Sequence, residues 1–237
     1  MNSDFENINI VKDKQEKKIN HSTLKKYYTD DVNILEIGVD EAGRGPLFGR
    51  VYAAAVILPK DETFDHSKMK DSKKFHSKKK IEEVANYIKE NALAWVVSYE
   101  DENVIDEINI LQATQKSMHE CIKKIIQPYE KESFQLLIDG NYFNPIKIFN
   151  NKYEFIPHVC IEGGDNKYSA IAAASILAKV SRDKYIEDLV EENPYLTENY
   201  GIGSNKGYGS KKHMDGIKNY GITQWHRKTF GICKNYI

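Results

Sequence analysis

The stretch ILEIGVDEAGRGPLFGRVYAAAVIL, residues 34–58, carries two apolar runs that flank a glycine-rich turn. Each run contains isoleucine and valine, which favour strands with buried faces. The first run ends at the carboxylate pair Asp40-Glu41, immediately before the turn. The pattern predicts a hairpin of two buried strands with acidic side chains near its turn.

Helical spacing and apolar runs alternate along the chain after this hairpin. Prolines at 128 and 194 end the two longest predicted helices. The segment after Pro194 is turn-rich and predicts short helices and loops. Strands that alternate with helices indicate an α/β or α+β fold, in which helices cover the faces of a sheet. The predicted helices span 77–91, 101–127 and 167–192, and the predicted further strands span 92–99, 134–139 and 155–165.

The composition is that of a globular protein and excludes several classes. Of the 237 residues, 41% are hydrophobic and 29% are charged, which rules out wholesale disorder. No apolar run is long enough to span a membrane, and the N-terminus lacks the apolar region of a secretion signal. Three widely spaced cysteines without a CxxC pair exclude a disulfide scaffold and a structural zinc site. We expect a soluble, cytoplasmic protein that does not associate with membranes.

The charge is balanced in total but uneven in distribution. The formal net charge is -1, yet residues 66–80 hold seven lysines against one acid, and residues 206–234 hold seven basic residues against one acid. Two basic segments of this kind can form one positive surface for a polyanion such as nucleic acid. Solvated lysine-rich loops give the same pattern, so charge alone leaves both interpretations open.

Three acidic sites share one context, in which a β-prone run delivers a carboxylate as the strand ends. The sites are Asp40-Glu41, Asp139 and Asp165. Four carboxylates that converge at one sheet end repel each other unless cations neutralise them, and oxygen ligands select Mg²⁺ or Mn²⁺ over zinc. Two such ions can hold a phosphodiester, activate a water and stabilise the leaving oxygen. A lone Asp after a strand is more often a cap, and Asp165 is also placed to cap the following helix.

Eight blocks of sequence occur in a characteristic order from the hairpin to the C-terminal segment. They are DEAGRGPL (40–47), AAAVIL (53–58), DSKK (71–74), NILQAT (109–114), LLIDGN (136–141), GGDNKYSAIAAASILAKVSRD (163–183), NKGYGS with His213 (205–213), and HRKTF (226–230). In this order they strongly resemble the motifs of type 2 ribonuclease H, the ribonuclease HII family. The resemblance covers residues 34–231 and is therefore a whole-domain likeness.

The resemblance implies a fold, a reaction and a set of site residues. The fold would be α/β, a ribonuclease H-like mixed sheet flanked by helices, with a small helical C-terminal region. We accordingly divide the chain into a polar N-terminal extension (1–33), a catalytic core (34–193) and a C-terminal substrate-binding region (194–237). The substrates would be RNA–DNA hybrids and duplex DNA that contains a ribonucleotide, nicked on its 5′ side to leave 3′-hydroxyl and 5′-phosphate ends.

The resemblance also assigns roles to individual residues. The family's metal-binding quartet would fall on Asp40, Glu41, Asp139 and Asp165, the same carboxylates that the strand-end argument selects, and would hold two Mg²⁺ or Mn²⁺ ions. The remaining candidates would contact the nucleic acid through a 2′-hydroxyl, a sugar or phosphates. These are Gly43, Arg44 and Gly45 for the 2′-hydroxyl, Tyr208 for the neighbouring sugar, and Lys73, Lys74, Lys206 and Arg227 for phosphates.

Some features depart from the family's pattern and leave alternatives open. Phe48-Gly49-Arg50-Val51 stands where the family usually has Ala-Gly-Pro-Val, residues 144–154 resemble an insertion, and Ser210 replaces a more usual Thr. These differences leave substrate preference open. The alternatives are another ribonuclease H-like nuclease, such as type 3, and a nucleic-acid-binding module without catalysis. The C-terminal GICKNYI lacks a clear clamp-binding pattern, so we predict no protein partner from it, and we expect a monomer.

Overall fold

The computed structural model describes residues 24–129, 132–150 and 152–237. Within this part of the chain, five strands form one mixed sheet in the order β3-β2-β1-β4-β7. The predicted hairpin is confirmed, because β1 and β2 pair antiparallel. On the other side of β1, β4 pairs with it in parallel, and β7 pairs in parallel with β4. The strands are β1 (Ile34–Ala42), β2 (Val51–Ile57), β3 (Ala94–Glu100), β4 (Ser133–Asp139) and β7 (His158–Ile161).

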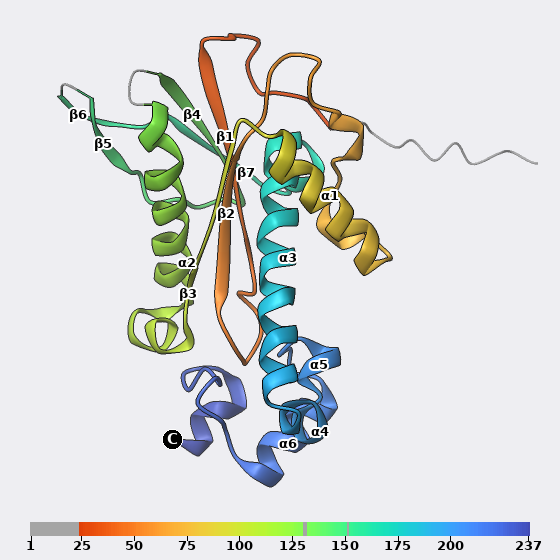
Figure 1. Cartoon of the computed structure of the whole chain (residues 1–237). Coiled ribbons are helices and arrows are strands. Elements are labelled where there is room, and N and C mark those ends of the chain that lie inside the picture. The colour runs from red at the N-terminus through yellow and green to blue at the C-terminus, as the bar shows by residue number, and fades with distance from the viewer. Residues whose placement is uncertain (1–23, 130–131, 151) are drawn as a thin grey trace, which may run out of the picture.

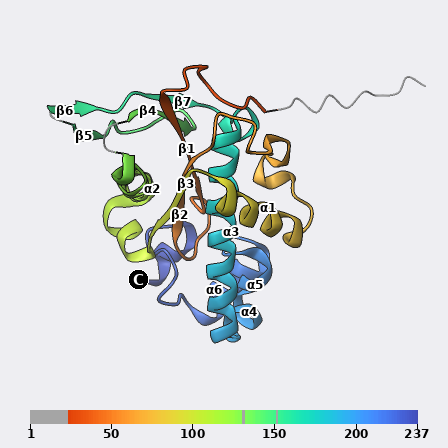
Figure 2. The same ribbon diagram turned by 45° about the horizontal axis from the view of Figure 1, so that its top comes forward.

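Helices cover both faces of this sheet, as Figures 1 and 2 show. Alternate residues of β2 point to opposite faces. Ala53 and Ala55 pack in the cluster that includes α2, whereas Ala54 and Val56 pack in the cluster with α1 and α3. The mixed sheet flanked by helices, which the sequence predicts, is therefore confirmed. The main helices are α1 (Lys78–Asn91), α2 (Glu102–Ile126) and α3 (Ser169–Glu192).

Helix α3 lies unusually close to the central strand because small residues line the contact. A Cβ atom added at Gly38 of β1 would come within 2.2 Å of the backbone of Ala170. The start of α3 therefore lies directly on the middle of β1, and Arg182, farther along α3, meets Gly43 just after the end of β1. The alanine-rich stretch of α3 is buried against the sheet, as its small residues predict.

Two local features differ from the sequence-based expectation. The predicted strand 155–165 is interrupted at Pro157, which has no amide to donate to a neighbouring strand. The segment before it forms a separate antiparallel pair, β5 (Lys147–Asn150) and β6 (Lys152–Phe155), within the insertion-like stretch. Helix α2 is broken at Asn109, whose φ of 69° is not helical, and the Asn109 side chain accepts from the amides of Leu111 and Gln112.

The C-terminal region consists of short helices and turns, as predicted. It packs on the lower half of α3 in Figure 1 through a cluster that contains Phe48, Ile186, Leu196 and Cys233. Its elements are α4 (Tyr195–Tyr200), α5 (Ile202–Asn205), α6 (Lys211–Tyr220) and the 3-10 helix η5 (Gly231–Tyr236). Further 3-10 turns are η1 (His66–Lys68), η2 (Ser72–Lys74), η3 (Gln127–Tyr129) and η4 (Gly164–Asn166).

The described part of the N-terminal extension is anchored to the core. Lys25 pairs with the backbone at Lys167 and Ser169, and the amides of Tyr28 and Thr29 donate to the buried carboxylate Glu36. Residues 1–23 of the predicted extension lie outside the described residues. Among the described residues, no helix combines the length and apolar character needed to cross a membrane. All three cysteines are free thiols.

Candidate active site

The acidic residues predicted from strand ends gather at one end of the sheet. Val39 is level with Ile138 in the parallel pair, so Asp40 and Asp139 follow side by side on adjacent strands. Asp139 is in turn paired with Ile161 at the end of β7, and Asp165 follows in η4. The amide of Gly164 donates to Asp139 Oδ1 at 2.6 Å and fixes this turn against β4.

Asp165 does not cap the helix that follows it. Helix α3 begins at Ser169, its cap position is Tyr168, and no side chain there accepts from the first turn. The Asp165 carboxylate instead accepts from the Asn166 side chain at 3.1 Å and lies 3.9 Å from the Lys73 amino group. The capping alternative for Asp165 is therefore wrong.

A cleft of about 410 Å³ opens beside the strand ends. It is bounded by the sheet on one side, by α3 along its length and by the 205–208 segment of the C-terminal region. Its walls combine acidic, basic and hydroxyl side chains, as a site for a charged polar substrate requires. The lining side chains include Asp40, Glu41, Asp139, Ser72, Lys73, Ser175, Lys179, Arg182, Asp183, Asn205, Lys206 and Tyr208.

Burial is the main cause that raises the pKa of three of these carboxylates, and their mutual repulsion adds to it. Burial, together with the nearby charges of Glu41 and Asp139, raises the pKa of Asp40 well above its usual range. Burial likewise raises the pKa of Glu41, and the Arg44 guanidinium 3.4 Å away opposes this rise. For Asp165, burial and then the charge of Asp139 raise the pKa. The negative charge is thus concentrated beyond what the adjacent bases neutralise.

The donor set fits hard divalent cations. Asp40 is 5% exposed, its Oδ1 accepts the amide of Glu41 at 2.7 Å, and the Ser175 hydroxyl also hydrogen bonds to its carboxylate. Carboxylate oxygens from neighbouring strands are the ligands that Mg²⁺ and Mn²⁺ prefer. Over residues 24–129, 132–150 and 152–237, no three acidic, histidine or cysteine side chains stand in positions that ligate a single ion. The fit therefore rests on the chemistry and mutual repulsion of the carboxylates.

The glycine-rich turn after Asp40-Glu41 forms one wall of this site together with the Tyr208 segment. Gly43 has a φ of 95°, a conformation that favours glycine. The Leu47 amide donates to the carbonyl of Gly207 at 2.9 Å, so the turn and the Tyr208 segment are joined through their backbones. A Cβ atom at Gly45 would lie 3.5 Å from the ring of Tyr208, which is 53% exposed. Both groups predicted to meet a ribonucleotide therefore lie beside each other.

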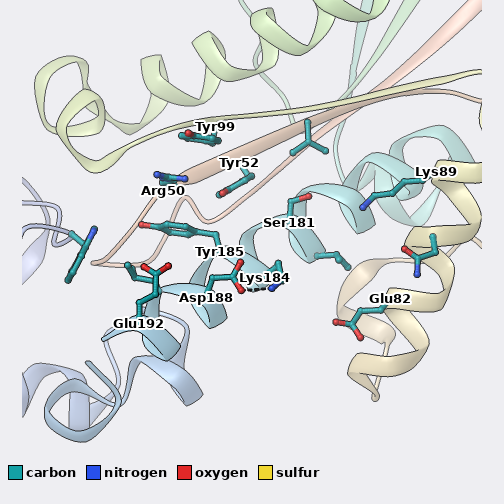
Figure 3. Close-up of a pocket in the computed structure, with 15 residues that line it drawn as sticks. Arg50, Tyr52, Glu82, Lys89, Tyr99, Ser181, Lys184, Tyr185, Asp188 and Glu192 are labelled. Atoms are coloured by element: carbon teal, nitrogen blue, oxygen red, sulfur yellow. Dashed lines mark hydrogen bonds and ion pairs between the residues drawn. The ribbon is translucent and has the colours of Figure 1, made fainter. Parts of the chain in front are cut away.

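The departures at Phe48 and Arg50 have clear structural roles on the other side of this turn. Phe48 is fully buried in the C-terminal cluster. Arg50 lies between the rings of Tyr99 and Tyr185, with its guanidinium carbon 4.1 and 4.4 Å from their centres. Figure 3 shows this stack at the edge of a groove of about 870 Å³, outside the carboxylate cleft. Neither residue points into the cleft.

Two of the predicted phosphate-binding lysines stand at the rim of the carboxylate site. Lys73 is 82% exposed at its side chain and lies beside Asp165. Lys74 is exposed and hydrogen bonds to the side chain of Asn166. Asp71 accepts from the Lys73 amide at 2.8 Å and from Asn166 at 3.2 Å, so it holds the lysine turn against η4.

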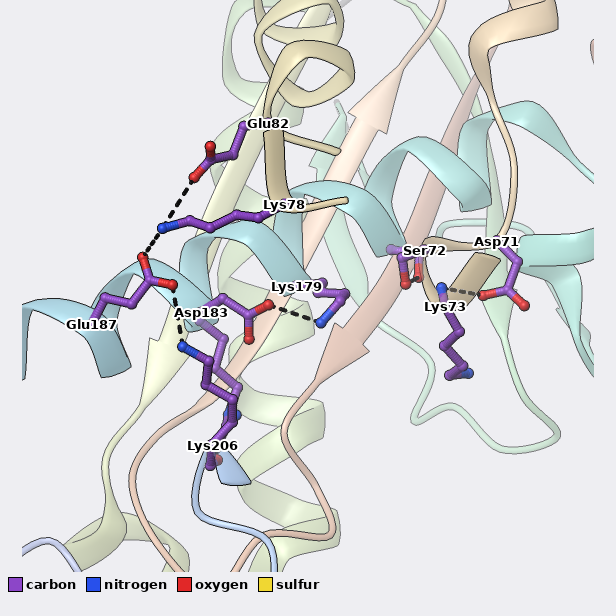
Figure 4. Close-up of polar contacts among 11 residues, drawn as sticks. Asp71, Ser72, Lys73, Lys78, Glu82, Lys179, Asp183, Glu187 and Lys206 are labelled. Carbon is purple, nitrogen blue, oxygen red and sulfur yellow. Dashed lines mark hydrogen bonds and ion pairs between the residues drawn. The ribbon is translucent and has the colours of Figure 1, made fainter. Parts of the chain in front are cut away.

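Lys206 reaches the site from the C-terminal region and belongs to a network of ion pairs (Figure 4). Its amino group lies 3.2 Å from one oxygen of Glu187 on α3, whose other oxygen binds Lys78 of α1 at 2.5 Å. This network ties α1, α3 and the 205–208 segment together. Lys206 itself has a φ of 52°, so the chain turns sharply just before Tyr208.

With this geometry in view, comparisons with known proteins identify the family. The family model described as Ribonuclease HII matches residues 37–233. Ribonuclease HII of Bacteroides thetaiotaomicron is 45% identical over 201 residues, covering 84% of this chain and 91% of that protein. The chain belongs to the ribonuclease HII family. Ribonuclease HII of Porphyromonas gingivalis is 44% identical over 207 residues, covering 87% of this chain and 93% of that protein.

Membership of the ribonuclease HII family makes the chain a type 2 ribonuclease H enzyme, so the type 3 and non-catalytic alternatives are wrong. Solved structures agree at the level of the fold. Ribonuclease HII in the PCNA:RNase HII complex of Archaeoglobus fulgidus has a TM-score of 0.62 at 24% identity and covers 84% of this chain and 96% of its own. Bst ribonuclease HIII in complex with Mn²⁺ has a TM-score of 0.58 at 18% identity and covers 86% and 69%.

The prediction that Arg227 of this ribonuclease HII contacts phosphate is wrong. The resemblance to the family assigns Arg227 to phosphate. Its side chain is completely buried, and its guanidinium donates to backbone carbonyls rather than facing solvent. No route to a phosphate remains for these donors, so Arg227 belongs to the support of the site.

Sequence reasoning missed several residues that surround the site. Arg182 on α3 and the paired histidines His213 and His226 are buried beneath the glycine-rich turn. Ser72 and Ser175 hydrogen bond to each other at 3.0 Å between the lysine turn and α3. A usable signal existed for α3, since residues 175, 179, 182 and 183 share one helical face.

Proposed function

We propose that this chain hydrolyses the RNA strand of RNA–DNA hybrids and nicks duplex DNA on the 5′ side of an embedded ribonucleotide, with two divalent ions. Ribonuclease H activity follows from its family; the nick position and the two-ion chemistry are the proposal. The observation that supports it best is that Asp40, Glu41 and Asp139 share one cleft with Gly43 and Tyr208, while Asp165 lies next to this cleft, 3.9 Å from Lys73. A phosphodiester next to a 2′-hydroxyl would meet both features at once.

Asp40, Glu41, Asp139 and Asp165 would hold the cations. Bound there, two divalent ions would neutralise the carboxylates, stabilise charge on the phosphate and lower the pKa of the attacking water. Asp40 neighbours Glu41 on its own strand and Asp139 on the next strand, so it would hold cations together with both of them. Mg²⁺ and Mn²⁺ both accept this donor set.

The chain's own residues would select the ribonucleotide. Backbone groups of Gly43 and Gly45 can approach a sugar closely because no Cβ intervenes. A 2′-hydroxyl is the group that distinguishes RNA from DNA at a given position. The half-exposed ring of Tyr208 is held beside Gly45. It would pack on the neighbouring sugar and fix the position of that sugar, whether ribose or deoxyribose.

Basic side chains at the rim would hold the nucleic-acid backbone. Lys73 and Lys74 flank Asp165, and Lys206 lies on the Tyr208 side, so the phosphates would cross the cleft between them. All of these residues belong to one chain, which supports a monomeric enzyme. The archaeal relative was solved with PCNA, whereas a protein partner for this chain stays unassigned, and its cytoplasmic location stays a sequence-based prediction.

The test uses end-labelled duplex DNA that carries one ribonucleotide, alongside an all-DNA duplex and a long RNA–DNA hybrid. With Mg²⁺ or Mn²⁺, we expect a single nick 5′ of the ribonucleotide, multiple cuts in the hybrid and none in all-DNA. Products should carry 3′-hydroxyl ends, which a polymerase extends directly. Cleavage of the hybrid alone would refute the proposed recognition of a DNA–RNA junction, and metal-independent cleavage would refute the role of the carboxylates.

A further inference from the structure

Arg227 binds the inner side of the glycine-rich turn through its whole guanidinium. A guanidinium carries five N–H donors in one plane, and here each meets a carbonyl of the segment 43–50. The contacts are Nε to Gly49 at 2.8 Å, Nη1 to Arg44 at 2.9 Å and Pro46 at 2.8 Å, and Nη2 to Gly43 at 2.6 Å and Arg50 at 3.2 Å. One side chain thus fixes the path of eight residues.

A second buried arginine joins this turn to the Tyr208 segment. Arg182 of α3 donates to the carbonyls of Phe48 at 3.3 Å and Arg50 at 3.2 Å, and also to that of Lys206 at 3.0 Å. A Cβ atom at Gly43 would come within 2.2 Å of its Nε, so the turn lies directly on this side chain. Arg182 therefore contacts both walls of the recognition site.

Two buried histidines complete the support beneath Tyr208. His226 Nδ1 accepts the Thr223 amide at 2.9 Å, so its proton is on Nε2, which faces His213 Nε2 at 3.0 Å. His213 must then accept at Nε2 and donate from Nδ1, and its Nδ1 meets the Tyr208 carbonyl at 2.9 Å. Both imidazoles are neutral in this chain of hydrogen bonds. We call Arg182, Arg227, His213 and His226 the Arg–His cluster.

We propose that the Arg–His cluster positions the Gly43–Gly45 turn and Tyr208 relative to each other, and so sets the selectivity for a ribonucleotide. The inference rests on the proposed function, because it concerns the groups assigned there to the sugar. Glycines at 43, 49 and 207 adopt positive φ and carry no side chains that could anchor the two segments. The arginines supply the missing anchors through carbonyls: Arg227 is fully buried, and Arg182, only 3% exposed, lies at the wall of the cleft with its donors on the backbone. A recognition site tolerates displacements of only about 0.5 Å, so this support matters for function as well as for folding.

Arg227→Lys and Arg182→Lys provide the test, because lysine keeps the charge but cannot bind several carbonyls in one plane. The measurement is kcat/KM for duplex DNA with one ribonucleotide, divided by kcat/KM for a uniform RNA–DNA hybrid. We expect this ratio to fall by about tenfold, with a rise in KM for the single-ribonucleotide substrate. A purely structural role would lower both activities in proportion to the folded fraction and leave the ratio unchanged, which would overturn the inference.

Asp106→Asn is the milder companion variant. Asp106 of α2 accepts from the amides of Lys228 at 2.8 Å and Thr229 at 2.9 Å, and so holds the segment that carries Arg227 without contacting the turn. If an arginine variant fails to fold, the ratio for Asp106→Asn decides, and we expect a fall of about threefold. Lys228→Ala, a neighbouring change at an exposed side chain, should leave the ratio at its wild-type value.

Amide hydrogen exchange separates this inference from the proposed function. Arg227→Lys should speed exchange in both 43–50 and 205–209 while the strands stay protected. If the wild-type enzyme cleaves hybrids but ignores single ribonucleotides, the proposed junction recognition fails. Faster exchange in both segments, with weakened hybrid cleavage through KM, would then still support the positioning role. Faster exchange in 43–50 alone would overturn it, because the two segments would not be coupled.

Discussion

Two charged clusters lie on opposite sides of the same glycine-rich turn, and they are built in contrasting ways. The carboxylates Asp40, Glu41, Asp139 and Asp165 converge with much of their charge unneutralised, and burial together with mutual repulsion raises the pKa of three of them. The Arg–His cluster is fully buried or nearly so, and its arginine donors and histidine nitrogens meet backbone or ring partners.

The contrast shows how a folded chain separates binding from support. Like charges that face a cleft cost stability unless a ligand arrives, so their presence indicates a site for cations. The five donors of Arg227 all bind carbonyls, which offsets the cost of burying its charge and leaves no donor for a ligand. Burial lowers the pKa of Arg227 to about 9, yet its guanidinium stays charged at neutral pH and the carbonyl dipoles stabilise that charge.

The largest expected effect is the loss of cleavage when a carboxylate of the site is replaced. Asp40→Asn should reduce cleavage of every substrate by about a thousandfold, equivalent to about 4 kcal/mol of transition-state stabilisation. The same change should leave the fold intact, or stabilise it, because it removes one of several repelling charges. Single-turnover cleavage with Mg²⁺ and urea unfolding without metal give the two measurements.

Asp188→Asn serves as the matched control, since Asp188 lies on α3 but faces the groove outside the cleft and pairs with Lys184. Its cleavage rate should match the wild type. Near-normal cleavage by Asp40→Asn would show that the carboxylates are not the catalytic site.

Breaking the Arg–His cluster should instead lower the stability of the fold. Arg227→Ala removes five hydrogen bonds and leaves their carbonyls buried without partners, so we expect the free energy of unfolding to fall by about 3–5 kcal/mol. Lys228→Ala, at the next residue, should change it by less than about 0.5 kcal/mol. Urea denaturation followed by circular dichroism provides the comparison, and equal losses for both variants would contradict the assigned role of Arg227.

The sequence predicted the two clusters to very different extents. The carboxylate site could be predicted because each carboxylate follows a β-prone run, and parallel neighbours such as β1 and β4 bring their ends together. Apolar periodicity also predicts the hairpin, the three main helices and a sheet covered by helices, whereas the mixed arrangement of the sheet is implied by the family resemblance.

The Arg–His cluster could not be predicted from sequence patterns. A basic residue in a lysine-rich, turn-rich segment is usually solvated, and only the closure of 226–230 onto 43–50 buries Arg227. His213 and His226 are thirteen residues apart, without a periodic pattern that relates them. The break of α2 at Asn109 and the division of the predicted 155–165 strand at Pro157 likewise depend on tertiary contacts and local backbone geometry.

Acid should weaken the Arg–His cluster through its histidines. Burial, with His213 adjacent, lowers the pKa of His226 to about 3, whereas an unfolded histidine titrates near 6.5. Below about pH 6.5 the unfolded chain takes up a proton that the folded chain does not, so stability falls as the pH drops. From pH 7 to pH 5 this amounts to about 2 kcal/mol for one imidazole.

The carboxylates act in the opposite direction. Their raised pKa values mean that the folded, metal-free protein binds protons first, so their contribution to stability increases as the pH falls. The net fall in the free energy of unfolding from pH 7 to pH 5 should therefore be larger in Asp40→Asn than in the wild type, and smaller in His226→Gln. The neighbours that face His226 are His213, Thr223 and the rings of Phe48 and Tyr200, none of them acidic. Unchanged pH dependence in His226→Gln would assign the acid sensitivity elsewhere.

A bound cation should stabilise the protein through the carboxylate site and not through the Arg–His cluster. At about ten times its Kd, Mg²⁺ should raise the free energy of unfolding by about 1.4 kcal/mol through mass action. The increase should disappear in Asp40→Asn and persist in Asp106→Asn, since the second change lies in the support of the Arg–His cluster. Thermal melting with and without metal measures it, and an equal increase in Asp40→Asn would place the cation outside the carboxylate site.

The smallest effect concerns the exposed lysines at the rim, which differ from Arg227 in exposure and therefore in role. Lys73→Ala should weaken binding of a hybrid about two- to fivefold and reduce the slope of log affinity against log salt by about 0.9, the value for one lost phosphate contact. Lys184→Ala is the matched control, because this exposed lysine of α3 pairs with Asp188 away from the cleft. Fluorescence anisotropy across a salt series gives both slopes, measured with Asp40→Asn as the background so that substrate stays intact. If Lys73→Ala and Lys184→Ala change the slope equally, the phosphates do not pass beside Asp165 and the path of the nucleic acid must cross another part of the rim.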